Sequence, residues 1–291
     1  MKVWRIIISI LWEGKRMNKL LTANFARLRK NQVFIFSIVF MFVIGILFPL
    51  VTYQEMIELD VTYYLQERAF WYPAFLGFIL AVFCSLFLGT DNSDNTIRNK
   101  LIVGHTRNSI YLSNLITCMV VGVVLCLVHT ATIICVGTPL LGFYTMEISD
   151  IIGYTVAIIT MTFSFSAIYT FVSMKCQSKA TIAVICLTLW ICFLFISLYV
   201  QNKLMEPEMI ENVLLSNTGV QSTEMVANPD YISGTTRNLF TFLSEFLPSG
   251  QAILFMRCEA THWGQIILYN LITSGILSVV GMFFFKRRDL Q

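Results

Sequence analysis

Six long stretches of this chain contain no Asp, Glu, Lys or Arg. Each is 19 to 27 residues long, and a helix needs about 20 residues to cross a hydrocarbon layer roughly 30 Å thick. The stretches are residues 33–51, 70–89, 115–141, 151–172, 180–200 and 263–285. They predict six transmembrane helices, so we expect an all-α integral membrane protein. With 56% hydrophobic residues and a mean hydropathy of +0.72, the main solvent of this chain is lipid.

The charges in the connecting segments divide unequally between the two sides of the membrane. One side holds 16 Lys and Arg residues against 4 acids, in residues 1–32, 90–114, 173–179 and 286–291. The other side holds 4 against 13, in residues 52–69, 142–150 and 201–262. Because Lys and Arg are retained on the cytoplasmic face, we expect both termini in the cytoplasm, with 286–291 as a short tail.

The cytoplasmic N-terminal segment, residues 1–32, contains a predicted amphipathic helix. From Leu20 to Asn31 the apolar side chains fall on one broad helical face and the basic ones lie off it. Such a helix would lie along the inner leaflet, and the alternative is a plain basic anchor beside the first span. Residues 1–16 are either a further interfacial helix or precede a translation start at Met17.

The cytoplasmic loop 90–114 is the most patterned polar segment. A short helix is expected there, with an N-cap from Asp91, Ser93 or Asp94 and an end at Gly104 in the left-handed conformation. A second helix is expected to start near Thr106 or Asn108 and lead into the third span. The first helix combines an apolar ridge with cations, which suits docking on a soluble partner, and the alternative is a solvated loop. The ridge is Ile97, Leu101 and Ile102, and the cations are Arg98, Lys100 and Arg107.

The extracellular segment 201–262 is too long for a plain connection. Two apolar runs in it, 239–247 and 252–256, are separated by Pro248-Ser249-Gly250 and are too short to cross a membrane. They indicate re-entrant or interfacial helices, and a small folded cap over the outer surface is the alternative.

Within the spans, His129 is the only candidate for a group that could carry charge as part of an ion or proton pathway. His129, near the middle of the third span, is expected to be a neutral, hydrogen-bonded group, with a contact to substrate as the alternative. Asn270 is expected to be a buried hydrogen-bonding group. Ser274, Gly275 and Ser278, together with Gly281, predict a small-residue face that serves internal packing or a dimer seam.

Motifs for catalysis are missing from the sequence. It contains no H-E-x-x-H, no G-x-S-x-G and no pair of acids within a span. It also lacks the G-x-x-x-x-G-K-[ST] phosphate-binding loop, so any ATP must be used by another polypeptide. No Cys and His cluster suggests a metal site. Because the spans hold no carboxylate or cation, an ion-coupled secondary transporter is disfavoured.

The loop between the second and third spans resembles that of the permease subunits of ABC-2-type ATP-binding-cassette transporters, a bacterial exporter group. The similar segment is GTDNSDNTIRNKLIVGHTRNSIYLSNL, residues 89–115, which departs from the family pattern in having Asn95 where glycine is expected before Thr-Ile-Arg. Weaker similarity lies in MNKLLTANFARLRKN from Met17, LPSGQA at 247–252 and FFFKRRDL at 283–290. With the six spans, the resemblance covers nearly the whole chain from Met17.

The resemblance implies an ABC-2-type exporter fold in a bacterial plasma membrane, with an amphipathic helix before span one and re-entrant helices before span six. It implies a second permease copy, as a homodimer or a pair, and two cytoplasmic ATPase subunits that hold ATP and Mg²⁺. This chain itself would hold no cofactor or metal, and nucleic acid is not an expected partner. The coupling helix contacting the ATPase would comprise Thr96, Ile97, Arg98, Lys100, Leu101 and Ile102, with Arg107 beyond it.

The cargo is the least constrained part of this prediction. Spans rich in Phe, Met and Ile and free of charge favour a hydrophobic or amphipathic molecule, such as a peptide antibiotic, a drug or a lipid-like compound. The alternative functions are a non-pumping membrane sensor or immunity protein and, less favoured, the ion-coupled transporter.

Overall fold

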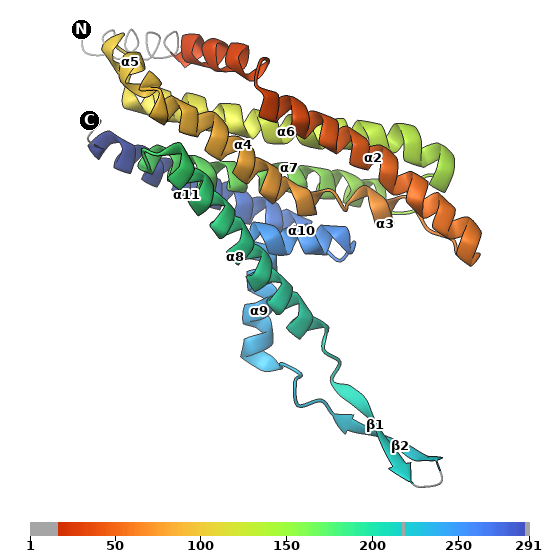
Figure 1. The fold of residues 1–291 in the computed structure, drawn as a ribbon. Coiled ribbons are helices and arrows are strands. Elements are labelled where there is room, and N and C mark those ends of the chain that lie inside the picture. Colours follow the sequence, from red (N-terminus) through yellow and green to blue (C-terminus); the bar gives the residue numbers. More distant parts are fainter. Residues whose placement is uncertain (1–16, 217–218, 289–291) are drawn as a thin grey trace.

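The computed structural model describes residues 17–216 and 219–288 (Figure 1). Within them six helices are long and apolar enough to cross a membrane, which confirms the six predicted spans. The spans are α2 (Gln32–Leu59), the short α3 (Gln66–Ala69) with α4 (Pro73–Ser93), α6 (Arg107–Leu141), α7 (Ile148–Lys175), α8 (Lys179–Met205) and α11 (Trp263–Arg287). The expectations for residues 1–16 and 289–291 lie outside the described range.

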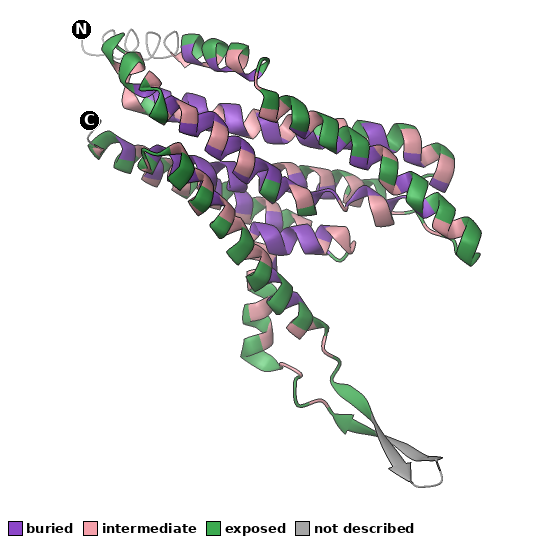
Figure 2. Cartoon of the chain, viewed as in Figure 1, coloured by how far each residue is buried: buried purple, intermediate pink, exposed green. Residues whose placement is uncertain are grey.

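The spans α4 and α7 form the centre of the bundle. In their most apolar windows 67% and 61% of the residues are buried, against 17% in α8 and 22% in α11. Helix α7 contacts α4, α6 and α11, while α2 packs on α6 and α8 packs on α4. Figure 2 accordingly shows buried residues concentrated inside the bundle and exposed ones along the outer sides of α2 and α8. These outer surfaces are apolar, as expected where helices meet lipid.

Residues 17–28 form a helix, called the N-terminal helix below, at one end of the bundle (Figure 1). Its buried residues are Leu20, Asn24 and Leu28, which are spaced four apart and therefore share one face. The Asn24 amide donates hydrogen bonds to Asn114 Oδ1 at 2.9 Å and Thr117 Oγ1 at 3.3 Å, both on α6. The helix is therefore attached to the bundle through a polar contact and does not rest on lipid alone.

The loop between α4 and α6 contains one short helix, α5 (Thr96–Ile102). The expectation that Asp91, Ser93 or Asp94 caps this helix is wrong, because α4 continues through Ser93 and no side chain caps α5. Asn95 makes the turn with a φ of 54°, a left-handed conformation that asparagine tolerates better than other residues with a Cβ. The departure from glycine at this position therefore preserves the turn.

The other end of the loop follows the sequence signals closely. Gly104 has a φ of 94° directly after α5, as expected for a helix C-terminus. Thr106 caps α6, since its side-chain oxygen accepts a hydrogen bond from the Ser109 backbone N–H at 3.2 Å. The second helix of the loop is not separate, because α6 runs without a break from Arg107 into the third span.

The segment before the last span holds two strands and two helices. The strands β1 (Met209–Ser216) and β2 (Gly219–Ala227) pair antiparallel, with Met209 opposite Ala227, and the hairpin projects away from the bundle (Figure 1). The hairpin was not expected from the sequence. Helices α9 (Gly234–Phe246) and α10 (Pro248–Met256) cover the two predicted apolar runs and meet at a bend of 90°.

Candidate coupling site at one end of the bundle

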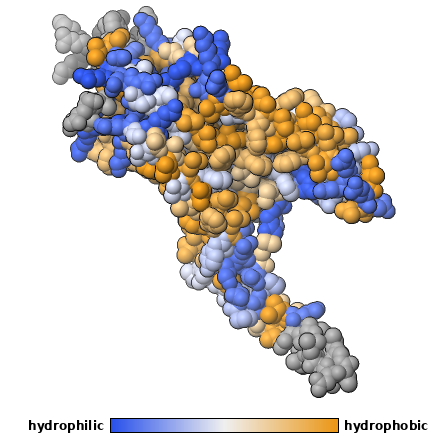
Figure 3. Space-filling model, in the orientation of Figure 1, coloured by the Kyte–Doolittle hydropathy of each residue, from blue (hydrophilic) through white to orange (hydrophobic). Residues whose placement is uncertain are grey.

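One end of the bundle gathers four segments that are far apart in the sequence: the N-terminal helix, α5, the turn from α7 to α8, and the end of α11 (Figure 1). Hydrophilic residues concentrate at this end in Figure 3. Its centre is Asp91 in the last turn of α4, whose carboxylate is fully buried. A buried carboxylate is costly unless it is paired, so the partners of Asp91 decide whether this end is stable.

Two cations pair with Asp91. Arg27 of the N-terminal helix binds Oδ1, and Lys100 of α5 binds Oδ2 with an N–O distance of 2.9 Å. The Arg27 guanidinium also donates to the Phe87 carbonyl at 3.0 Å and lies 3.7 Å from the centre of the Phe87 ring. One carboxylate therefore ties the N-terminal helix and α5 to the end of α4.

A second set of contacts holds the end of α11. Arg107, the first residue of α6, donates to the Phe285 carbonyl at 2.9 Å and to the Arg288 carbonyl. Arg288 in turn donates to Asn92 Oδ1 at 3.1 Å and to the Met174 carbonyl at 2.7 Å. Burial lowers the pKa of Arg288 from its usual value. These bonds join four helix ends into one unit, because carbonyls at helix C-termini accept readily from cations.

The residues expected to form the coupling surface divide into two groups. Ile97 is buried, Leu101 packs partly against the core, and Lys100 and Arg107 make the internal bonds described above. Arg98 is exposed, Ile102 is 75% exposed, and Thr96 is half-buried. Only Arg98 and Ile102 are therefore presented openly to a partner.

Val103 belongs to this exposed surface and was missed in the sequence. It is 78% exposed directly after Ile102, so two large apolar side chains project together from the tip of α5. The predicted ridge was defined by helical periodicity, and Val103 falls outside that periodicity because it lies between the last helical turn and Gly104. Its position directly before the C-terminal glycine was the signal that could have identified it.

A groove of about 460 Å³ runs beside α5. Asn95 and Arg98 line it on one side, and Gln177, Lys179 and Arg288 on the other. The groove carries three cations, Arg98, Lys179 and Arg288. The site as a whole offers a cationic concave surface beside an apolar projection, which is suited to binding a protein surface of complementary charge.

The polar groups expected within the spans have different surroundings. His129 is fully buried and stacks on Tyr72 with 4.2 Å between ring centres. In the described part of the chain neither ring nitrogen of His129 has a hydrogen-bond partner, which differs from the hydrogen-bonded histidine that we expected. The stacked ring places His129 in the core between α4 and α6.

Asn270 forms hydrogen bonds with two other helices. Its Oδ1 accepts from the Ser164 hydroxyl of α7 at 2.9 Å, and its Nδ2 donates to Gln251 Oε1 of α10 at 2.9 Å. Gln251 then donates to the Glu245 carbonyl at the end of α9 at 2.8 Å. Ser164 and Gln251 were not singled out in the sequence, because a polar side chain in a predicted span or in a short apolar segment gives no sign of its partner.

Among the small residues of α11, Gly275 does not share the inward face that holds Ser274, Ser278 and Gly281. Ser274 is buried, whereas Gly275 is exposed, and no heavy atom of the described residues lies within 4 Å of where a Cβ of Gly275 would be. Ser278 is half-buried and donates to the Ser274 carbonyl. Within this chain Ser274 therefore serves internal packing, and Gly275 points outward.

A family model described as ABC-2 family transporter protein matches residues 20–212, which is about two thirds of the 291-residue chain. The match includes the N-terminal helix, the Asp91 cluster, α5 and the first five spans. No curated protein is similar enough to count as a match. The six membrane-spanning helices and this match together show that the chain belongs to the ABC-2 transporter family, as a membrane component of the transport system.

Proposed function

We propose that this chain is the permease subunit of an ATP-driven exporter in a bacterial plasma membrane, working with a separate cytoplasmic ATPase that holds ATP and Mg²⁺. The end of the bundle that carries α5 would face the cytoplasm, together with both termini. Support comes from the family membership and from the 12 Lys and Arg residues that the described segments 17–32, 90–114, 173–179 and 286–288 hold at this end.

The observation that carries this proposal is the pair Ile102 and Val103 at the tip of α5, exposed beside Arg98. Two large apolar side chains in water gain free energy when a partner covers them, and a neighbouring cation favours an acidic partner. ATPase contact at this tip would be transmitted efficiently, because Ile97 and Lys100 fix α5 to the bundle on its other face. A movement of α5 caused by the ATPase would reach α4 and α6, which α5 connects.

The proposed cargo is a hydrophobic or amphipathic molecule, such as a peptide antibiotic, a drug or a lipid-like compound. The charge-free spans and their apolar outer surfaces support it. A second copy of the permease would complete the pathway. The outward-pointing Gly275 on α11, one of the most exposed spans, leaves room for a helix of that copy to approach closely.

The double variant Ile102→Asp with Val103→Asp tests the coupling site. Both side chains are exposed, so folding is expected to be unchanged, while association with the ATPase is expected to weaken about thirtyfold, since losing a hot spot costs about 2 kcal/mol or more. The matched control is Phe143→Asp, because Phe143 is 81% exposed in the loop at the far end of α6.

The measurement is the amount of ATPase polypeptide that co-purifies with the permease from native membranes, together with its ATP hydrolysis. A loss in the double variant but not in the Phe143 variant supports the proposal. If the permease is isolated without an ATPase and still transports when ATP is depleted, the proposal is wrong. If both variants retain the ATPase equally, the partner binds elsewhere and the assignment to α5 is wrong.

A further inference from the structure

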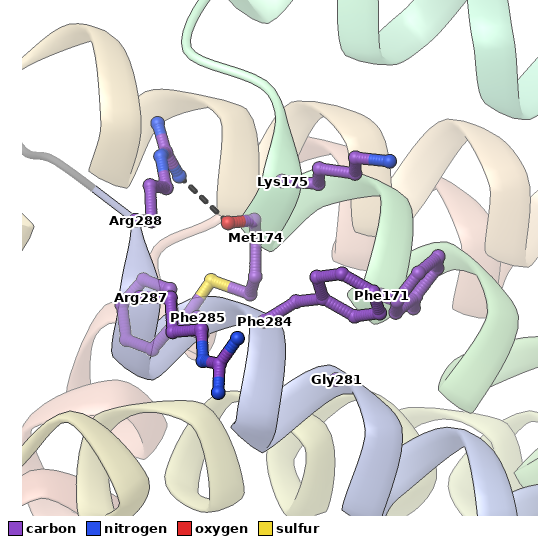
Figure 4. A pocket seen from close by; sticks show the side chains of 8 residues that line it. All are labelled: Phe171, Met174, Lys175, Gly281, Phe284, Phe285, Arg287 and Arg288. Carbon is purple, nitrogen blue, oxygen red and sulfur yellow. Dashed lines mark hydrogen bonds between the residues drawn. The ribbon is translucent and has the colours of Figure 1, made fainter.

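A second pocket lies at the same end of the bundle, between the last turns of α7 and α11 (Figure 4). Its volume is about 270 Å³. Apolar and basic side chains both line it, as the close view shows. The apolar lining, called the floor below, consists of Phe171, Met174, Phe284 and Phe285, and the basic lining, called the rim below, consists of Lys175, Arg287 and Arg288.

The three rim cations are held by neutral groups. Lys175 lies 5.7 Å from the centre of the Phe284 ring, and the Arg287 guanidinium lies 4.2 Å from the centre of the Phe283 ring. Arg288 donates to the Met174 carbonyl at 2.7 Å. Across residues 17–216 and 219–288, none of the three forms a salt bridge with an acid. The rim therefore carries positive charge that no described carboxylate balances.

Asp91, the fully buried acid at this end of the bundle, does not balance the positive charge of the rim. Asp91 is already paired with Arg27 and Lys100. Long cationic side chains at the ends of membrane helices often just extend into the headgroup layer. Arg288 differs from that pattern, because its guanidinium binds the end of α7 and an α4 side chain, Asn92, and so closes the pocket on one side.

The combination of floor and rim selects the chemical class of the ligand. A small soluble anion would use the cations and leave the aromatic floor in contact with water. A phospholipid would place its phosphate at the rim and the upper part of an acyl chain on the floor. The pocket lies at the last turn of two spans, which is the depth of the headgroups, and basic pockets between membrane helices are known to favour anionic headgroups.

We propose that this pocket binds one anionic phospholipid from the surrounding bilayer, with its phosphate among Lys175, Arg287 and Arg288 and an acyl chain against Phe171 and Phe284. The lipid bridges the ends of α7 and α11. The proposal does not depend on export or on an ATPase, since it requires only that the bundle spans a bilayer.

The test compares lipid retention in nanodiscs that contain either phosphatidylcholine alone or phosphatidylcholine mixed with phosphatidylglycerol. Bound lipids are counted by native mass spectrometry of the full-length protein. The pocket variant is Lys175→Gln with Arg287→Gln. The matched control, Lys19→Gln with Lys286→Gln, removes two exposed cations from the same end outside this pocket. The variant Lys175→Arg with Arg287→Lys preserves the charge and guards against an effect of misfolding.

The unaltered protein, the control and the charge-preserving variant are expected to retain one phosphatidylglycerol molecule. The pocket variant is expected to lose the preference for phosphatidylglycerol by about tenfold or more. The proposal is wrong if the unaltered protein shows no preference for phosphatidylglycerol. It is also wrong if the control loses this preference as much as the pocket variant does, because general surface charge would then explain the binding. Complete displacement by soluble glycerol phosphate would also overturn it, because the pocket would then bind a headgroup anion and not a lipid.

Discussion

Lys100 Nζ lies 2.9 Å from the buried carboxylate of Asp91, nine residues earlier in the chain. A lysine that the sequence pattern assigns to a partner surface is thus directed into its own protein. The same carboxylate holds Arg27, which lies 64 residues away from it in the chain. One acidic side chain therefore links both the N-terminal helix and α5 to the end of α4.

The first prediction concerns that side chain. Asp91→Asn removes the charge that Arg27 and Lys100 share, and breaking a buried ion pair costs about 3–5 kcal/mol. We expect the purified protein to melt at a clearly lower temperature and amide hydrogen exchange to increase in the N-terminal helix and α5. Asp94→Asn is the control, because Asp94 is exposed in the same loop. Equal melting temperatures for the two variants would contradict a structural role for Asp91.

The turn at Asn95 leads to a second prediction. Asn95→Gly should leave stability nearly unchanged, since glycine adopts a φ of 54° freely. Asn95→Val should cost about 1–2 kcal/mol, because a β-branched side chain is strained in the left-handed region. Thermal unfolding in the same detergent measures both. A valine variant as stable as the glycine variant would show that the turn relaxes to another conformation.

Two glycines on α11 provide an internally controlled prediction. A Cβ at Gly281 would overlap the hydroxyl of Tyr111 on α6, whereas a Cβ at Gly275 would meet no neighbour within 4 Å. Gly281→Ala is expected to destabilise the bundle by about 1–3 kcal/mol, as overpacking does. Gly275→Ala is expected to leave the isolated subunit as stable as before. If Gly275→Ala instead weakens a purified dimer, Gly275 lies at the seam between two copies.

The thiol of Cys258 predicts a dependence on pH. Burial, with smaller contributions from the Glu67 and Glu259 carboxylates, raises the pKa of Cys258 to about 11. Because only the thiolate is alkylated, the rate for Cys258 should rise about tenfold per pH unit from pH 7 to about pH 10. Peptide mapping after alkylation in nanodiscs measures the rate.

The control for this experiment is Thr261→Cys in a Cys258→Ser background, since Thr261 is exposed in the same loop. Its rate should level off above about pH 8.5, the usual pKa of a free thiol. A plateau for Cys258 at the same pH would show that the thiol is open to water.

The spans were predictable because lipid imposes one simple rule on sequence: a charge in the hydrocarbon layer is expensive, so its absence over about 20 residues marks a crossing. The C-terminal end of α5 and the start of α6 were predictable for a similarly local reason. Gly104 and Thr106 act on the backbone within a few residues of themselves, and both take the conformations that their types favour.

Features that depend on distant partners were not predictable. In the sequence, Asn24 is a polar residue within an apolar helix face. The residues around it do not indicate that its hydrogen-bond partner is Asn114, 90 residues later. The internal role of Lys100 was not predictable for the same reason, because it depends on how α5 folds back on α4. The hairpin β1–β2 was not predictable either. Its described side chains, in residues 209–211 and 225–227, are exposed, so they supply no alternation of buried and exposed positions that would set a register.

The bend between α9 and α10 has a consequence for topology. If α9 and α10 continued in a straight line, the pair would form a seventh crossing, and the last helix would then end at the opposite surface. Gly250 lies against the Ser244 backbone at the bend, where a side chain of any size would collide with it. With the 90° bend, a re-entrant path that enters and leaves at one surface would keep the number of crossings at six. The absence of a single methyl group at Gly250 thus permits the sharp bend on which an even number of crossings would depend.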